Sequence, residues 1–329
     1  MNIISPIAYG NGAYIIHKAL SSRIEGYNVN AYNPYLSLFP PLIKLLNSDS
    51  ADIIHAPVDY SYFLYDKNRP LISTFHSYVL DQHLRRYSSL MQNIHYATDL
   101  KYFIKKSLEV STVITSVSQY LARKVRDDLG YKGEIRVIHN GVDTDKLVPQ
   151  KKIKSNKNPV KLLFCGNPTR KKGAQYIPQI LDKTEKNIEL IYTSGIGGKN
   201  HIIKHPKARC VGKIDHSNIN RLYAEADILL FPSMREGFGL VIAEAMACGL
   251  PVIATNCSAI PELIVDSKGG YLCEPGDVSD FADRINALAN SHIMRKEMGE
   301  FNRTTAVEKF HIDLMTNRYK LLFEEILSY

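Results

Sequence analysis

The chain has 329 residues, 45% of them hydrophobic and 22% charged, which is ordinary for a soluble globular protein and long enough for two domains. It contains no run of ~18 uncharged apolar residues that could span a bilayer, and its N-terminus lacks the basic region of a signal peptide. The net charge of +8 permits attraction to an anionic substrate or an acidic membrane surface, but no motif supports nucleic-acid binding. Five cysteines without a C-x-x-C pair favour reduced thiols over disulfides or zinc.

The N-terminal half shows the alternation of strands and helices that is typical of a doubly wound α/β sheet. An apolar run over residues 2–8 is followed by a turn with Gly10, Asn11 and Gly12, and then by a helix to about Arg23. The glycine spacing is not G-x-G-x-x-G, which disfavours a dinucleotide site. The residues leave two interpretations of this loop open: a plain turn, or backbone that closely approaches a ligand.

Further strands and helices are predicted in this half from apolar runs and their flanking turns. We expect strands over residues 29–32, 52–56, 71–77, 113–118 and 135–139, a short helix over 39–46, and helical structure over 81–110.

One of these strands places a histidine where ligands of open α/β sheets bind. His76 lies at the carboxyl end of the strand over 71–77. A lone histidine is more often structural or solvated, so the residues alone favour that interpretation. His55 has a similar position after the preceding strand and is a weaker candidate. We interpret His17 and His83 as surface or helix residues.

The segment 81–110 carries basic side chains among tyrosines and a phenylalanine. A solvated helix face is the favoured interpretation, and a patch that approaches anionic lipid is the alternative. The basic residues are Arg85, Arg86, Lys101, Lys105 and Lys106.

The second half begins after a polar run over 151–159 that we interpret as a linker. A strand over 160–165 leads into a loop that Gly166 and Gly173 bound and that contains Arg170 and Lys172. Because Arg is a forked donor and Lys a point charge, a basic loop after a strand is suited to a pyrophosphate. A solvated basic loop explains these residues equally well.

The rest of this half is predicted to continue the α/β alternation. We expect strands over 188–193, 208–212 and 226–231, and helices over 220–226, 278–290, 292–306 and 312–327.

The central feature of this half is a glycine loop followed by a short helix. Gly237 and Gly239 bring bare N–H groups to the start of a helix near Leu240, which suits an anion such as phosphate. Glu236 precedes the helix and Glu244 lies within it. Carboxylates accept hydrogen bonds from vicinal hydroxyls, so a sugar and a ribose are natural ligands. The alternative is a surface helix with two solvated glutamates.

The run from Met234 to Pro251 resembles the E-x7-E signature of retaining nucleotide-sugar glycosyltransferases of family 4, with Glu236 and Glu244 as its glutamates. The resemblance continues in register to about residue 272 and is thinner in the N-terminal half. It implies the α/β GT-B fold, with two Rossmann-like doubly wound domains facing across a cleft. The implied parts are an acceptor-side domain over 1–148, a nucleotide-sugar domain over 149–310, and a helix over 311–329 that crosses back to the first domain.

The resemblance also implies roles for individual residues. His76 and Glu236 would contact the donor sugar, and Lys172 the pyrophosphate. The family usually has Arg directly after the first loop glycine, but Asn167 stands there, so we infer that Arg170 supplies the guanidinium. The donor-binding set would be Gly10, Asn11, Gly12, Gly166, Gly212, Gly237, Phe238, Gly239, Leu240 and Glu244.

The implied reaction is transfer of a sugar from a UDP- or GDP-linked donor to a hydroxyl of a glycan, a lipid-linked or a small-molecule acceptor, with retained anomeric configuration. Cationic side chains would replace a divalent metal, so we expect neither metal nor cofactor. We expect a cytoplasmic protein, with a peripheral contact at the inner face of an anionic membrane as an open alternative.

Two other functions remain open at this point. A GT-B sugar phosphorylase or epimerase would act on sugar phosphates; a lysine-linked pyridoxal phosphate would favour the phosphorylase, and release of UDP or GDP would exclude this class. A catalytically silent partner subunit would keep the fold without turnover, although the presence of His76, Lys172, Glu236 and Glu244 argues against it.

Overall fold

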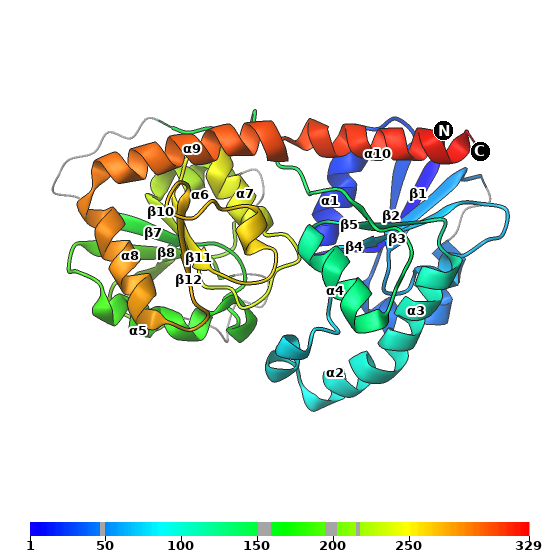
Figure 1. Cartoon of the computed structure of the whole chain (residues 1–329), viewed down its shortest axis with the longest axis horizontal. Coiled ribbons are helices and arrows are strands. Elements are labelled where there is room, and N and C mark those ends of the chain that lie inside the picture. Colours follow the sequence, from blue (N-terminus) through cyan, green and yellow to red (C-terminus); the bar gives the residue numbers. More distant parts are fainter. Residues whose placement is uncertain (47–49, 151–158, 195–202, 215–217, 329) are drawn as a thin grey trace. The chain divides into compact units, whose positions relative to one another are not determined.

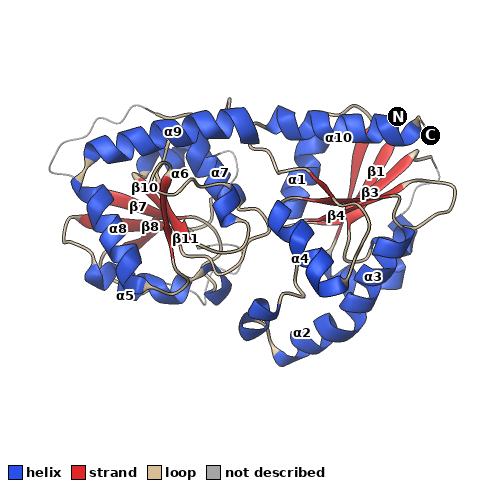
Figure 2. Cartoon of the chain, viewed as in Figure 1, coloured by secondary structure: helices blue, strands red, loops and turns tan. Residues whose placement is uncertain are grey.

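The computed structural model describes residues 1–46, 50–150, 159–194, 203–214 and 218–328 (Figure 1). The chain divides into two compact units: Met1–Gly141 with Ile312–Tyr329, and Val142–His311. Each unit is an α/β fold around a six-stranded sheet in which the paired strands are parallel (Figure 2). The predicted linker over 151–159 lies outside the described residues except for Pro159.

The sheet of the first unit has the strand order β2-β1-β3-β4-β5-β6. Its strands are β1 (Ile3–Ala8), β2 (Tyr27–Tyr32), β3 (Ile53–Pro57), β4 (Leu71–Phe75), β5 (Val113–Ser116) and β6 (Arg136–Val137). Its helices are α1 (Gly12–Ser21), α2 (Leu90–His95), α3 (Lys101–Val110), α4 (Gln119–Leu129) and α10 (Ile312–Leu327).

Local sequence explains where these elements begin and end. Strands β1, β3 and β4 are apolar runs that are buried almost throughout, as expected for parallel strands covered on both faces. The side chain of Asn11 caps α1 by accepting from Tyr14 N, and Ser118 caps α4 in the same way. Gly130, at a φ of 66°, ends α4 in the left-handed conformation that favours glycine.

Helix α10 packs within the first unit although it lies at the C-terminal end of the chain. The ring of its Tyr319 lies 5.1 Å from that of His55, and the ring of Phe323 lies 5.9 Å from that of Tyr27. Because these aromatic rings are buried, the helix completes the core of this unit.

The sheet of the second unit has the order β12-β11-β10-β7-β8-β9. Its strands are β7 (Val160–Phe164), β8 (Ile188–Tyr192), β9 (Ala208–Cys210), β10 (Ile228–Phe231), β11 (Val252–Thr255) and β12 (Gly270–Cys273). Its helices are α5 (Ile177–Lys183), α6 (Ile219–Glu225), α7 (Leu240–Ala247), α8 (Val278–Asn290) and α9 (His292–Phe310).

Helix α7 is short, slim and closely packed. Three of its eight residues are alanines, and all three are buried. A Cβ atom on Gly299 of α9 would lie 2.2 Å from the carbonyl oxygen of Gly249, so only glycine allows this approach between the two segments. Arg303 of α9 donates to the carbonyl oxygen of Ala247, which satisfies part of the C-terminal end of α7.

Each strand order reverses at one point, and that point predicts where a ligand binds. In the first unit the switch point lies between the neighbouring strands β1 and β3, and in the second unit between β7 and β10. From one of the two strands the chain adds further strands toward one edge of the sheet, and from the other strand toward the opposite edge. Ligands of open α/β sheets bind outside the carboxyl ends of the strands at such a switch point. The loops after β1, β7 and β10 therefore frame the candidate sites.

The described structure departs from the predicted elements in three places. The last strand of the first unit, predicted over 135–139, is only the two residues of β6. The helix predicted over 39–46 is a 3-10 helix over Pro40–Leu46. The helical segment 81–110 consists of a 3-10 turn, α2, a π-helical turn over Tyr96–Leu100 and α3. Among the described residues, no helix combines the length and apolar character needed to cross a bilayer.

Candidate functional site

Two loops of the second unit meet at its switch point. The loop after β7 approaches the start of the loop after β10 so closely that a Cβ atom on Gly173 would lie 1.9 Å from the carbonyl oxygen of Pro232. Gly173 also has a φ of 74°, which other residues rarely adopt. The N–H of Met234 donates to the carbonyl oxygen of Lys171, which joins the two loops through the backbone.

This junction brings together two of the predicted catalytic side chains. The Lys172 Nζ lies 2.5 Å from Oε1 of Glu236. The same Oε1 accepts a hydrogen bond of 2.6 Å from Ser233 Oγ, and the Glu236 N–H donates to Ser258 Oγ. Only 12% of the Glu236 side chain is exposed, against 31% for Lys172. Glu236 is thus fixed by three partners, and the Lys172 ammonium, with three donors, also reaches the solvent-facing side.

The N-terminus of α7 lies directly after this glutamate in the chain. Gly239 is its N-cap at a φ of 109°, with no side-chain cap, and its carbonyl oxygen accepts from the N–H groups of Ile242 and Ala243. Phe238 is buried and anchors the loop through its ring, 5.6 Å from that of Phe310. Because no side chain caps this helix, the first N–H groups of α7 are left for an anion to bind.

The second glutamate is fixed on α7 by a neighbouring helix. The Tyr223 hydroxyl of α6 donates a hydrogen bond of 2.7 Å to Oε2 of Glu244. Burial raises the pKa of Tyr223 well above its usual value, so this hydroxyl remains a donor. Burial, and then the charge of Glu244, raises the pKa of the Cys165 thiol to about 12, which makes it an uncharged neighbour.

Two predicted glycines of this unit present open backbone at strand ends. Gly166 follows β7 at a φ of 125° and Gly212 follows β9 at 81°, and a Cβ atom on either would meet nothing within 4 Å. Thr193 Oγ1 accepts from the Gly166 N–H and donates to its carbonyl oxygen, which fixes this turn. The space beside both glycines is compatible with a ligand that lies against the main chain.

The side chain inferred to replace the family arginine lies in the same loop. Arg170 is exposed and is the first residue of the 3-10 turn Arg170–Lys172. Asn167, three residues earlier in the loop, is also exposed. The structure therefore brings Lys172 to Glu236, whereas Arg170 extends into solvent.

In the predicted loop of the first unit, Gly10 has open space beside its backbone and Asn11 has a structural role. Gly10 has a φ of 87° and open space at its Cβ position, as Gly166 does. The side chain of Asn11 serves as the N-cap of α1, and Gly12 is the first residue of that helix. Of these three predicted donor-binding residues, Gly10 presents open backbone, and Asn11 has a structural role as the helix cap.

His76 is partly buried at the end of β4, and its ring contacts His17 of α1. Its Nε2 lies 2.9 Å from Nε2 of His17, while its Nδ1 is buried and has no hydrogen-bond partner among the described residues. Burial lowers the pKa of His76 to about 3, so the ring is neutral near neutral pH.

The interpretation of His17 as a surface residue is wrong, although it does lie on a helix. It is fully buried, on the face of α1 that also carries Ile16 and Leu20. Its spacing of three from Leu20 was the available signal. The weaker candidate His55 is also fully buried; its two ring nitrogens face Tyr27 and Thr74, and burial followed by the charge of His76 lowers its pKa to about 3.

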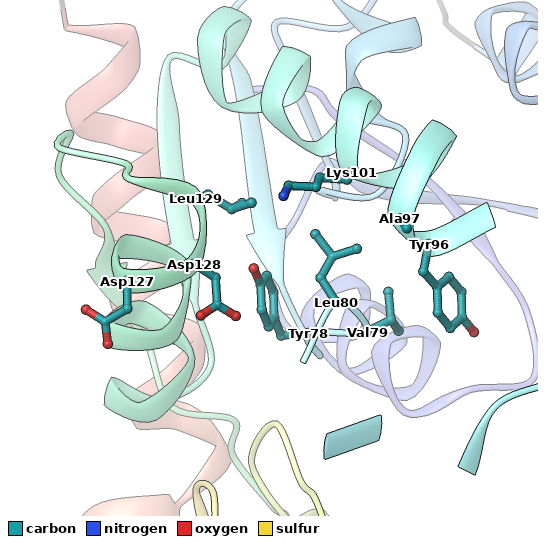
Figure 3. A pocket seen from close by; sticks show the side chains of 9 residues that line it. All are labelled: Tyr78, Val79, Leu80, Tyr96, Ala97, Lys101, Asp127, Asp128 and Leu129. Carbon is teal, nitrogen blue, oxygen red and sulfur yellow. The ribbon is translucent and has the colours of Figure 1, made fainter. Parts of the chain in front are cut away.

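Sequence reasoning did not identify a pocket of 310 Å³ in the first unit (Figure 3). Figure 3 shows Tyr78 next to Asp128, with the ammonium of Lys101 directed toward the same space. Tyr78 is 4% exposed and its hydroxyl has no hydrogen-bond partner among the described residues. The lining residues are Tyr78, Val79, Leu80, Tyr96, Ala97, Lys101, Asp127, Asp128 and Leu129.

Among the described residues, no group of three or more His, Cys, Asp or Glu side chains is arranged to hold a metal ion. Family comparison then assigns both halves of the chain. Residues 16–146 match the family "Glycosyltransferase Family 4", and residues 146–305 match "Glycosyl transferases group 1". The chain belongs to the group 1 glycosyltransferases of family 4.

Relatives of this glycosyltransferase extend over nearly its whole length. The N-acetyl-alpha-D-glucosaminyl L-malate synthase of Bacillus anthracis is 26% identical over 92% of this chain and 83% of its own. A sucrose-phosphate synthase from Thermosynechococcus elongatus shares the fold with a TM-score of 0.83, at 18% identity and 100% coverage of both chains. The Anabaena protein HepE, solved with UDP and glucose, has a TM-score of 0.79 at 17% identity, covering 98% of this chain and 99% of its own.

These relatives and the two parallel sheets show that this glycosyltransferase has the GT-B fold of two Rossmann-like domains. They do not favour the phosphorylase, epimerase or silent-subunit alternatives.

Proposed function

We propose that this nucleotide-sugar-dependent glycosyltransferase transfers a hexosyl group from a UDP- or GDP-linked donor to a hydroxyl, with retention of the anomeric configuration. One observation carries the proposal: the ion pair of Lys172 and Glu236 is fixed at the switch point of the second unit, directly before the N-terminus of α7. A cation, a helix N-terminus and a carboxylate at one strand edge suit a sugar attached to a pyrophosphate.

In this proposal the second unit binds the donor and stabilises the leaving group. Lys172, Arg170 and the first N–H groups of α7 would stabilise the charge that develops on the pyrophosphate, which is the largest contribution in reactions of this type. Glu236 would accept hydrogen bonds from donor-sugar hydroxyls and Glu244 from the ribose. Binding the sugar through Glu236 would also position the anomeric carbon next to the cations.

The remaining predicted contacts follow from the open backbone. Gly166 would allow the pyrophosphate, and Gly212 the nucleobase, to lie against the main chain, since neither has an obstacle at its Cβ position. In the first unit, Gly10 would admit the phosphate or the acceptor, and Nδ1 of His76 would contact the donor sugar.

The proposed reaction uses neither a metal nor a covalent enzyme intermediate. The cations named above would take the place of a divalent ion, and an oxygen of the departing phosphate would accept the proton of the attacking hydroxyl on the same face as the leaving group. Turnover in excess EDTA, with product stereochemistry followed by proton NMR, tests both points. An inverted product, or activity that requires added Mg²⁺ or Mn²⁺, would contradict them.

The donor class is tested first by thermal stability of the wild-type chain with UDP, GDP, ADP and their sugar conjugates. A ligand at about a hundredfold excess over its Kd stabilises the folded state by about 2.7 kcal/mol. We expect a shift with one base only, and its loss in Glu244→Ala. Glu225→Ala, an exposed glutamate on α6, is the matched control. No shift with any nucleotide would contradict the proposal.

We assign the acceptor to the first unit, and the pocket beside Tyr78 is the supporting observation. Its buried hydroxyl without a partner, the Lys101 ammonium and the Asp128 carboxylate offer donors and an acceptor to a polyhydroxylated molecule. Lys101→Ala should raise the KM for the acceptor several-fold and leave that for the donor unchanged. An unchanged acceptor KM would exclude this pocket.

Peripheral contact with an anionic membrane remains a proposal for the segment 81–110. Leu90, Met91 and Ile94 of α2 are 77%, 80% and 56% exposed, and Arg86 and Lys101 lie nearby in the chain. Apolar side chains beside cations are typical of a segment that binds at a lipid interface. Sedimentation with vesicles that contain anionic lipid, but not with neutral vesicles, should be weakened by Met91→Glu.

A further inference from the structure

The turn that follows β11 contains a strained residue beside the charged site of the second unit. Among the described residues, two residues other than glycine have a positive φ: Ser258 at 53° and Ser267 at 62°. Residues with a side chain rarely adopt this conformation, and it persists only where the surrounding structure holds it. Ser258 is half-buried and follows β11, the neighbour of β10, whereas Ser267 is exposed in the turn before β12.

The two strained serines differ in what their hydroxyl groups contact. Ser258 Oγ accepts a hydrogen bond of 2.9 Å from the N–H of Glu236, which lies 22 positions away in the loop after β10. Ser267 Oγ donates a hydrogen bond of 3.1 Å to the carboxylate of its own neighbour, Asp266. The conformation of Ser258 therefore joins two loops at the carboxyl edge of the sheet, while that of Ser267 belongs to a local turn.

The residue before Ser258 contacts the same loop. Sγ of Cys257 lies 3.3 Å from the carbonyl oxygen of Met234 and 3.5 Å from that of Ser233. Burial raises the pKa of the Cys257 thiol, so it stays protonated and can donate to either carbonyl. We call Cys257 and Ser258 the β11 brace, because both contact the main chain of the loop that ends in Glu236.

The β11 brace acts on the main chain of Glu236, whereas the remaining contacts act on its carboxylate. Oε1 of Glu236 accepts from the Lys172 ammonium and from the hydroxyl of Ser233. Lysine has a flexible stem, so its ammonium can follow the carboxylate without fixing the backbone that carries it. The carboxylate has a defined position only if the main chain of residue 236 is also held, and Ser258 supplies that contact.

We propose that Ser258 is a positioning residue for the transfer reaction, because its hydroxyl oxygen holds the main chain of Glu236 and so keeps the carboxylate beside Lys172. This role rests on the proposed function, in which Glu236 binds the donor sugar, whereas the β11 brace itself does not. A glycine at residue 258 would adopt the same φ without strain but would offer no acceptor to the Glu236 N–H. The hydroxyl oxygen therefore explains why a strained serine is present.

The contact is tested on the full chain without substrate. Hydrogen exchange of the Glu236 amide is followed by NMR of 15N-glutamate-labelled protein, and the signal is assigned by its absence in Glu236→Gln. We expect exchange at this amide to become about tenfold faster in Ser258→Gly, with the amide of Glu244 in α7 unchanged. Equal exchange at Glu236 in the wild type and in Ser258→Gly would overturn the proposal, whatever the activity of the chain.

The positioning role is tested by replacing each strained serine with glycine. Both replacements relieve the same kind of backbone strain, but only Ser258→Gly removes an acceptor from Glu236. We expect Ser258→Gly to reduce kcat about tenfold, which corresponds to about 1.4 kcal/mol, and Ser267→Gly to leave kcat unchanged. Full activity in Ser258→Gly would show that residue 258 serves the turn alone, and the proposal would be wrong.

A second variant separates the hydroxyl from the backbone strain. Ser258→Ala keeps the Cβ atom and the strain but lacks the oxygen, whereas Ser258→Gly lacks all three. If the hydroxyl oxygen is responsible, the two variants should lose activity alike, although Ser258→Ala should unfold at a lower urea concentration than Ser258→Gly. A loss of activity in Ser258→Ala that Ser258→Gly does not share would identify strain as its cause and would contradict the proposal.

The part of the ligand that is affected separates this inference from the proposed function. In the proposed function Glu236 contacts the donor sugar, while Glu244 and Gly212 contact the nucleotide. Ser258→Gly should therefore bind the free nucleoside diphosphate with wild-type affinity and lose only turnover of the sugar donor. An equal loss of nucleotide affinity would indicate general disruption of the site and would overturn the positioning role. If the wild type itself shows no turnover, the proposed function and the positioning role both fail, and amide exchange at Glu236 still decides whether the β11 brace is present.

Discussion

The two candidate sites of this glycosyltransferase differ in charge and in burial. In the second unit the site is charged and partly exposed, with Lys172 against Glu236 at the end of β7 and β10. In the first unit it is neutral and buried, with His76 at the end of a network of hydroxyls and imidazoles. Lys172 is partly exposed and can exchange Glu236 for a ligand, whereas the buried network holds neutral groups in fixed positions.

This difference follows from the cost of burial. A charge that is moved into a protein interior is stable only with a well-placed partner, and loss of that partner is costly. Neutral hydroxyls and imidazoles can be buried once each has its hydrogen bond. Charge is therefore expected where the pyrophosphate binds, and a neutral network where geometry alone is required.

The largest expected effect concerns the charged site. Lys172→Met removes the cation that the proposal places on the leaving group, and loss of one such contact reduces kcat by roughly 10²–10³-fold. The measurement is release of nucleoside diphosphate under saturating donor. Lys186→Met, an exposed lysine before β8, is the control that keeps its activity. A loss below about threefold would show that Lys172 does not act on the reaction.

The junction that carries this lysine gives the next largest effect. Gly173→Ala should lower the free energy of unfolding by about 3 kcal/mol, because strain in the left-handed region adds to a collision with the Pro232 carbonyl. Gly166→Ala, with open space at its Cβ position, should cost only the strain of about 1–2 kcal/mol but should weaken nucleotide binding. Urea unfolding separates the two, and equal losses would contradict the role of the junction.

The neutral site predicts a pH dependence of stability instead. His55 and His17 titrate near 6.5 when unfolded, and burial lowers the pKa in the folded state, to about 3 for His55. The stabilisation is complete above pH 6.5 and is lost as the pH falls below it, because the unfolded state then binds more protons. At pH 5 the loss is about 2 kcal/mol for His55, and His17 adds a loss of the same sign.

Unfolding experiments between pH 7.5 and 5 test this prediction. His55→Gln should reduce the loss of stability on acidification by about 2 kcal/mol at pH 5, the contribution of this one histidine. An identical pH slope in His55→Gln and the wild type would show that His55 is not neutral in the folded state.

The contrast between the two sites also explains what the sequence could predict. The loop glycines, Lys172 and Glu236 follow apolar strands within a few residues, so local pattern and the family resemblance place them at a strand edge. The pairing of Lys172 with Glu236 could not be predicted, because it depends on the approach of two loops separated by 64 positions.

The buried network was beyond local reasoning for a related reason. His17, Tyr27, His55 and Thr74 lie on four different elements, and only the strand order β2-β1-β3-β4 brings them together. By itself each has an ordinary sequence context: His17 was interpreted as a surface or helix residue, and His55 and Thr74 belong to predicted strands. The spacing of His17 on the apolar face of α1 was the one local sign of its burial.

The smallest expected effect concerns the loop arginine. Arg170 is exposed, so a contact with the pyrophosphate would be made in a solvated site and would contribute about 1 kcal/mol, or roughly fivefold in the KM of the donor. Arg170→Ala should raise that KM by this factor. Asn167→Arg restores the residue that the family usually has directly after the glycine of this loop, and in the Arg170→Ala background it should recover the lost affinity. If Asn167→Arg has no effect there, while Arg170→Ala alone leaves the KM unchanged, neither position supplies the guanidinium, and the charged site relies on Lys172 and the N-terminus of α7.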